Sequence, residues 1–337
     1  MENPRDHIAT ILDRRNDGQP GYWTGNPHSD TMPMYLAKLG LPDGEALYTH
    51  FGDDLRWIPA DSGYRHPEGR SPFDPYAGKQ RESLNMAGIF AECESIAEVE
   101  AHAWPNLDYL DFGPVLDRIQ THRTRAVWTG LWSPFFHDVA EYFGMDNYFM
   151  AMFDRPEIVD AVTDRIVTYY EQANERFFDQ LGDCADTFFF GNDFGTQRGL
   201  ILSPQLFNRF VLPSMLRLIG VAKRHGKRVV LHSCGAISEV IPTLIEHGVD
   251  GLHPLQALAT GMHAKDLARE FRGKIAFVGG VDSQDLLVNG TPAQVRDDVL
   301  RLRDLFGPNF VVSPSHEALL PNVPVENVAA MAAAARE

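Results

Sequence analysis

Cysteine is scarce in this sequence, basic residues are outnumbered, and long apolar runs are missing. Three cysteines in 337 residues are too few for a disulfide framework, so we expect a reduced, cytoplasmic setting. The 46 acidic residues exceed the 30 basic ones, which gives a net charge of −16. Because such a surface repels phosphates, neither nucleic acid nor an anionic membrane is an expected partner. No apolar run approaches about 18 residues, and the polar N-terminal segment does not read as a signal peptide.

Two regions of different composition follow each other along the chain. Residues 1–80 are rich in Pro, Gly and aromatic residues, and only 32–39 has a helical pattern. Long irregular segments in compact proteins are often functional, so we expect an N-terminal extension or lid that packs on the rest. Residues 81–337 are expected to form a single domain, in which strands and helices alternate from about residue 124.

The alternation of short apolar strands with amphipathic helices is the strongest architectural signal. Parallel strands buried on both faces have this continuous apolar character. Helices are predicted between them at 204–224 behind Ser203 as N-cap, at 238–247, and at 291–306 with a capping box. Repeated units of this kind predict a parallel sheet, and a (β/α)8 barrel fits better than an open sheet. The predicted strands are Ala126–Thr129, Thr187–Phe190, Val229–His232, Gly251–Pro254, Ile275–Val278 and Phe310–Ser313.

Side chains suited to catalysis or metal binding follow five consecutive predicted strands. Loops are polar in any protein, but ordinary loops favour Lys, Glu and Arg rather than these residue types. In a barrel the carboxyl ends of all strands meet at one rim, where barrel active sites lie. We therefore expect a site there, built from Asp193, His232, Cys234, His253, Gln256, Asp282, Ser315 and His316.

His232 and Cys234 stand two residues apart at the end of one predicted strand, in "RVVLHSCG". In extended backbone two such side chains face the same way, so both could bind one ion. The alternative is a hydrogen-bonded core histidine beside a buried cysteine. Catalytic zinc sites in proteins usually have three protein ligands. His316 in "SPSHEALLP" is the best third candidate, and His253 and Gln256 are further ones.

Four segments carry a family resemblance that covers roughly residues 105–335. The sequence resembles the uroporphyrinogen decarboxylase superfamily, which implies a (β/α)8 barrel. The arginine-rich N-terminal motif that grips the carboxylates in true decarboxylases is missing, which favours the zinc-dependent methyltransferase branch. The segments are "GNDFGTQRGLILSPQLFNRFVLPSM", "KRVVLHSCGAISEVIPTLIEHGVDGLHPLQALATGM", "KIAFVGGVDSQDLLVNGTPAQVRDDV" and "VVSPSHEALLPNVPVENVAAM".

That branch implies one zinc ion per chain, held by His232, Cys234 and His316. His316 stands where the family has a second cysteine, so an oxygen or nitrogen compound becomes a more natural substrate than coenzyme M. The methyl group would move between a small O-, N- or S-methyl compound and a thiol or a corrinoid carried by a partner protein.

The remaining candidate site residues have expected functional roles, and some of them also have a structural role as the alternative. Asp193 is expected as general acid or base, with a turn cap as the alternative, and His253 as a catalytic or ligand-orienting residue. The expected substrate or supporting residues are Gln256, Asp282, Trp23 and Ser315, and for Asp282 the formation of a turn is an equally open alternative. A metal-dependent lyase or hydrolase, or a decarboxylase, on the same barrel remains the alternative function. A homodimer is compatible with the sequence, which does not fix the oligomeric state.

Overall fold

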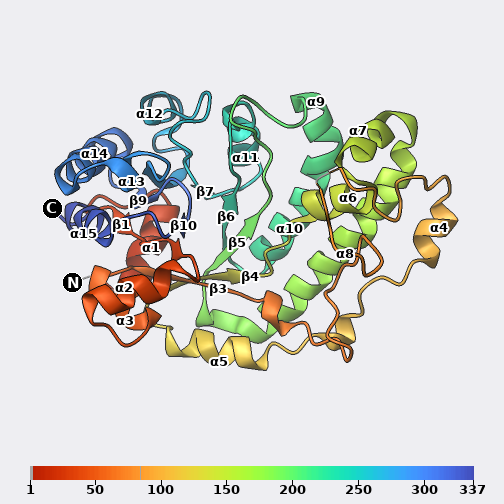
Figure 1. Cartoon of the computed structure of the whole chain (residues 1–337), viewed down its shortest axis with the longest axis horizontal. Helices are drawn as coiled ribbons and strands as arrows, with labels where there is room; N and C mark the ends of the chain where they lie inside the picture. Colours follow the sequence, from red (N-terminus) through yellow and green to blue (C-terminus); the bar gives the residue numbers. More distant parts are fainter. Residues whose placement is uncertain (1–2, 84) are drawn as a thin grey trace.

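The computed structural model describes residues 3–83 and 85–337, and its central feature is one sheet of eight parallel strands (Figure 1). Their order around the sheet is β1-β9-β8-β7-β6-β5-β4-β3. The two end strands meet, because Asp54 N donates to Tyr22 O at 3.0 Å and Tyr22 N donates to the Asp54 carboxylate at 2.8 Å. The predicted (β/α)8 barrel is confirmed. Its strands are β1 (Gly21–Tyr22), β3 (Leu55–Pro59), β4 (Ala126–Gly130), β5 (Thr187–Gly191), β6 (Arg228–His232), β7 (Gly251–His253), β8 (Ala276–Val281) and β9 (Phe310–Pro314).

All six strands predicted from the sequence belong to this barrel, and none of their ends differs from the prediction by more than three residues. The two that sequence reasoning missed, β1 and β3, come from the segment before residue 80. The structure therefore differs from the expected division, in which that whole segment lay outside the barrel. A strand of two residues carries too little pattern to be recognised, and only its pairing with β9 defines β1.

Helices surround the strands, and the predicted caps are formed. Ser203 Oγ accepts from Leu206 N, and Thr291 and Gln294 form the capping box. The helix predicted over 204–224 contains a π-helical stretch at Phe207–Val211. The α-helices are α1 (Pro4–Leu12), α2 (Thr31–Leu39), α3 (Gly44–Phe51), α4 (Ile96–Ala101), α5 (Gly113–Thr121), α6 (Phe135–Phe143), α7 (Met145–Asp154), α8 (Pro156–Leu181), α9 (Pro204–Leu206), α10 (Leu212–Arg224), α11 (Ile241–Glu246), α12 (Ala264–Phe271), α13 (Leu286–Asn289), α14 (Pro292–Phe306) and α15 (Val325–Ala334).

The inside of the barrel is a packed apolar core that α1 covers at the amino ends of the strands. Ile8, Ile11 and Leu12 of α1 join the inward side chains in one buried cluster. Gly21 and Gly251 permit this contact, since a Cβ at either would lie within 3 Å of an α1 side chain. The upper layer of the core is aromatic and includes Trp23, Trp57, Trp128, Trp132 and Phe189. The barrel is therefore filled, and its open end is the rim where the strands finish.

A second, two-stranded sheet ties the N-terminal segment to this rim. Here β2 (Asn26–Pro27), just after β1, pairs with β10 (Ala318–Leu319), just after β9. This pairing fixes the loop that contains His316 and Glu317. Among residues 3–83 and 85–337, no helix is both long and apolar enough to cross a membrane.

Candidate metal centre

The stretch "RVVLHSCG" places an imidazole and a thiol at the mouth of the barrel. Val229 to Leu231 are fully buried in β6. His232 ends the strand with 5% of its surface exposed, and its Nε2 lies 3.3 Å from Cys234 Sγ. The backbone turns at Gly235, whose φ of +86° suits glycine. The expectation that both side chains face the same point is confirmed.

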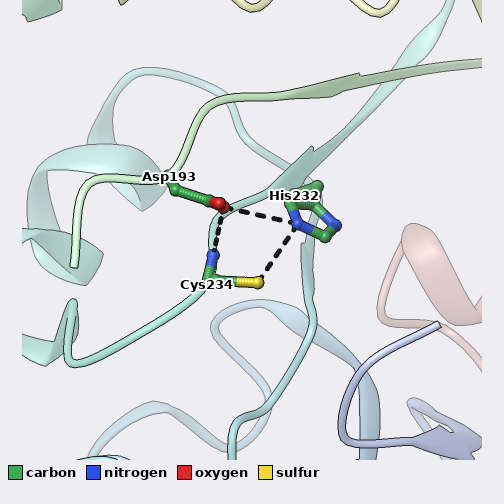
Figure 2. Close-up of side chains that lie close together, drawn as sticks. All are labelled: Asp193, His232 and Cys234. Carbon is green, nitrogen blue, oxygen red and sulfur yellow. Dashed lines mark hydrogen bonds and ion pairs between the residues drawn. The ribbon is translucent and has the colours of Figure 1, made fainter. Parts of the chain in front are cut away.

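Asp193 joins this pair from the loop after β5, as Figure 2 shows. Its Oδ1 accepts a hydrogen bond from Cys234 N at 2.8 Å and lies 3.4 Å from His232 Nε2. Asp193, His232 and Cys234 each offer one ligand atom, and these three atoms lie within 4.8 Å of one another. Ligand atoms of a tetrahedral zinc ion are about 3.5 Å apart, given bonds of about 2.0–2.3 Å. The three donors are thus spaced for a metal ion.

The electrostatics of the cluster favour a cation. Burial, then the Asp193 and Glu317 carboxylates, raise the pKa of the Cys234 thiol well above its usual range. Burial would also raise the pKa of Asp193, but His232 and the Cys234 N–H outweigh it, so that pKa falls below its usual range. The result is an ionised carboxylate beside a protonated thiol. A divalent cation would stabilise the carboxylate and make the thiolate the favoured form.

Behind His232 lies a second group of side chains that the sequence assigned only in part. His232 Nδ1 is 3.0 Å from Nδ1 of His253, which is fully buried at the end of β7. Burial, with smaller contributions from the neighbouring imidazoles of His232 and His316, lowers the pKa of His253 well below its usual range, so its ring is neutral. Glu317 Oε2 lies 3.6 Å from His232 Nδ1. Sequence reasoning missed Glu317, and its only signal was its place beside His316.

His316 lies at the edge of this cluster. Its ring centre is 6.2 Å from that of His232, with the rings perpendicular, and its Nδ1 accepts from Ala318 N at 3.1 Å. In the described part of the chain, the structure puts Asp193 rather than His316 within 4.8 Å of both His232 and Cys234. The assignment of His316 as a ligand stays a prediction.

Two of the four expected substrate or supporting residues fix loops of the rim. Gln256 Oε1 accepts from Gly235 N at 2.8 Å, so the glutamine holds the turn that follows Cys234. Asp282 accepts from the backbone N–H groups of residues 284–286, which is the turn-forming role that the sequence left open.

The other two of these residues pack in different layers of the site. Ser315 Oγ accepts from Ser283 N at 3.0 Å and lies on the rim. Trp23 is 2% exposed and lies beneath the rim, with its ring centre 5.3 Å from that of His253. Trp23 therefore forms the floor under the histidine rather than part of an open surface.

A cavity of about 320 Å³ opens beside His316. Gln256, Ser283 and Ser315 supply hydrogen-bonding groups. His316 also lines the cavity, and its ring centre is 6.2 Å from that of His232. Its lining residues are Gln256, Ala257, Ser283, Gln284, Val288, Ser315, His316, Ala318, Leu320, Asn322 and Val323. None of them is Lys, Arg, Asp or Glu, so the cavity suits a small uncharged molecule.

Two proteins of Methanosarcina mazei are among those to which this chain is similar. The methylated-thiol–coenzyme M methyltransferase of Methanosarcina mazei is 27% identical over 184 residues, which are 53% of this chain and 43% of that protein. The match thus spans less than half of the relative's length. The solved structure of a methyltransferase from Methanosarcina mazei has a TM-score of 0.68 at 17% identity, over 99% of this chain and 98% of that one. This second likeness shows the shared fold.

The sequence profile of the uroporphyrinogen decarboxylase (URO-D) family matches residues 136–337, which is more than half of the chain. The matched range contains β5 to β9 and all the side chains of the metal cluster. On this ground, and as the sequence analysis expected, the chain belongs to the uroporphyrinogen decarboxylase (URO-D) family.

Proposed function

We propose that this protein is a zinc-dependent methyltransferase of the URO-D family. It would move a methyl group between a small O-, N- or S-methyl compound and a corrinoid protein or a thiol. The observation that carries the proposal is the convergence of Asp193, His232 and Cys234 at ligand spacing on the barrel rim. The methyltransferase activity named for the Methanosarcina mazei relative supports it.

The donor set fits zinc, which binds imidazole nitrogen, thiolate sulfur and carboxylate oxygen. When bound, the ion would supply a Lewis acid that polarises a substrate heteroatom at its open position. His232 Nε2 and Cys234 Sγ would hold it together with one third ligand, either Asp193 Oδ1, which already lies at this spacing, or His316 from the loop after β9. Asp193 also fixes the Cys234 backbone through its hydrogen bond, so the thiol keeps its direction with or without a cation.

The cavity beside His316 is the proposed substrate site. Its uncharged lining favours a neutral methyl compound over the coenzyme M thiol, because a sulfonate buried there would have no cationic partner. Gln256 and Ser315 would orient such a molecule. The corrinoid would arrive on a partner protein.

A decarboxylase acting on a polycarboxylate is less well supported. Such a substrate requires several guanidinium groups that are free to bind carboxylates. Arg56 of β3 is 5% exposed, and its Nε and Nη2 donate to Glu45 at 2.8 and 2.7 Å. Its guanidinium is therefore already paired within the protein.

The first experiment measures bound metal in the protein purified under reducing, chelator-free conditions. We expect about one zinc per chain, lost in His232→Ala and Cys234→Ser. Cys184→Ser, which removes a cysteine far from the cluster, is the matched control and should keep the ion. Loss in His316→Ala would make His316 a ligand, whereas retention would leave Asp193 as the third. A metal-free wild type contradicts the proposal.

The second experiment measures the transfer of the methyl group from methylcobalamin to each of a panel of neutral and anionic thiols. The absorbance of the cobalamin reports the transfer. We expect transfer that requires zinc and fails in Cys234→Ser. If the zinc-loaded protein transfers no methyl group in either direction but converts a substrate without cobalamin, the protein is a lyase or hydrolase instead.

A further inference from the structure

Two buried polar atoms behind the metal cluster have no hydrogen-bond partner among the residues that the structure describes. One is Nε2 of His253, a residue with 0% exposure, and the other is Oε2 of Glu317, whose side chain is 13% exposed. The two atoms lie 4.0 Å apart. A buried polar atom without a partner is costly, so a pair that faces each other needs an explanation.

The pair continues a line that starts at the proposed metal ligand. From His232 Nδ1 the line runs 3.0 Å to His253 Nδ1, and from His253 Nε2 it runs 4.0 Å to Glu317. Glu317 Oε2 also lies 3.6 Å from Nδ1 of both His232 and His316. His253 Nδ1 is nevertheless the nearer partner of His232, and His316 Nδ1 accepts from Ala318 N. Glu317 is held from the other side, because its carbonyl accepts from Asn26 N at 2.6 Å and a Cβ at Gly25 would collide with it. The position of Glu317, at the end of this line, therefore depends on the pairing of β2 with β10.

We propose that His253 and Glu317 are positioning residues that set the tautomer and basicity of His232 for metal binding. This inference rests on the metal site proposed above. A metal on His232 Nε2 uses that lone pair, so the neutral ring carries its proton on Nδ1 and donates it to His253 Nδ1. His253 then holds its own proton on Nε2, which faces the Glu317 carboxylate. A closure of about 1 Å makes this a hydrogen bond and gives both atoms a partner.

A second cation between the same residues is the competing explanation. His232, His253 and Glu317 do offer three atoms within 4.8 Å of one another. Nevertheless, His232 Nδ1 and His253 Nδ1 face each other, and His316 Nδ1 already accepts from Ala318 N. Within this group of described residues, His253 Nε2 and the Glu317 carboxylate are then the atoms left to bind a cation, and a buried cation normally needs more ligands. The hydrogen-bonded line uses every one of these atoms.

The charge of Glu317 has a consequence for the metal. A carboxylate that accepts the His253 proton makes His253 a better acceptor and His232 a more basic ligand. Loss of such outer partners typically weakens metal binding about 10- to 100-fold. We expect a weakening of this size in Glu317→Gln, which keeps the shape of the side chain and removes its charge.

The first test measures zinc affinity and stoichiometry by competition with a chromophoric chelator. Glu326→Gln, an exposed carboxylate that pairs with Lys38, is the matched control and should bind like the wild type. His253→Phe should weaken binding at least as much as Glu317→Gln, and His253→Gln, which can still accept from His232, should weaken it less. Glu317→Gln with the affinity of the control overturns the inference while leaving the metal site in place. Two ions per chain, with one lost in Glu317→Gln, also overturn it, and no zinc in the wild type overturns both proposals.

The second test reads the tautomers by NMR of protein labelled with ¹⁵N-histidine. In the zinc-loaded wild type we expect His232 to carry its proton on Nδ1 and His253 on Nε2. In Glu317→Gln the His253 Hε2 resonance should move upfield, because an amide oxygen accepts more weakly than a carboxylate. A purely structural role would not predict this tautomer pair. A His253 proton on Nδ1 in the loaded protein would overturn the inference.

Discussion

Replacing Gly235 by alanine tests how the turn after Cys234 is built. The residue has a φ of +86°, and a Cβ there would overlap the backbone of Gly195 in the loop that follows β5. The two loops are also tied by the hydrogen bond between Cys234 N and Asp193. A methyl group at Gly235 therefore adds backbone strain and pushes apart the two loops that supply the metal donors.

Two other glycines separate these effects. Gly226 has a φ of +66° and nothing within 4 Å of its Cβ position, so Gly226→Ala measures strain alone, about 1–2 kcal/mol. Gly195 lies outside the left-handed region, but its Cβ would be 2.6 Å from Ala236 N. Gly195→Ala thus measures crowding alone, about 1–3 kcal/mol. Gly235→Ala combines both, so we expect it to lower the free energy of unfolding by about 2–5 kcal/mol.

The assay is the urea unfolding of the wild type and the three variants, all freed of zinc. Tryptophan fluorescence monitors the unfolding. Zinc affinity of the folded proteins is then measured separately. We expect Gly226→Ala to keep wild-type affinity and Gly235→Ala to lose affinity, because only the latter moves Cys234 away from Asp193. If Gly235→Ala costs no more stability than Gly226→Ala, the two loops are not in rigid contact and the reasoning is wrong.

Three further predictions concern the surroundings of the site. Phe189→Ala empties the layer under His253 and Trp132, and we expect calorimetry or urea unfolding to show a loss of about 3–5 kcal/mol. Burial raises the pKa of Asp138 from 3.8 to about 7, although Tyr170 OH donates to it. An acid whose pKa is raised on folding stabilises the protein below its unfolded pKa, and this is lost as pH rises through the folded pKa. The stability of the wild type, measured against Asp138→Asn, should therefore fall between about pH 4 and 7, and an unchanged difference would contradict the shift. Gln256→Leu leaves Gly235 N without its acceptor, so we expect a loss of about 1–3 kcal/mol in urea and weaker zinc binding.

The sequence by itself determined the features that depend on local pattern. Six buried strands could be recognised because each is a short apolar run bounded by turn residues, and helices α9 to α10 and α14 because their caps are coded nearby. The shared direction of His232 and Cys234 also follows from local geometry, since side chains two apart in extended chain face the same way.

Only the tertiary structure decided which partners surround that pair. The register of parallel strands sets Gly191 beside His232 and His232 beside His253, and this register depends on packing far along the chain. It brings Asp193 to His232 and Cys234 within 4.8 Å. Glu317 enters the cluster because β10 pairs with β2, two segments almost 300 residues apart. No local pattern in the sequence encodes such a contact, so the closeness of Asp193 to His232 and Cys234, and the carboxylate of Glu317 behind the histidines, could be found only in the folded chain.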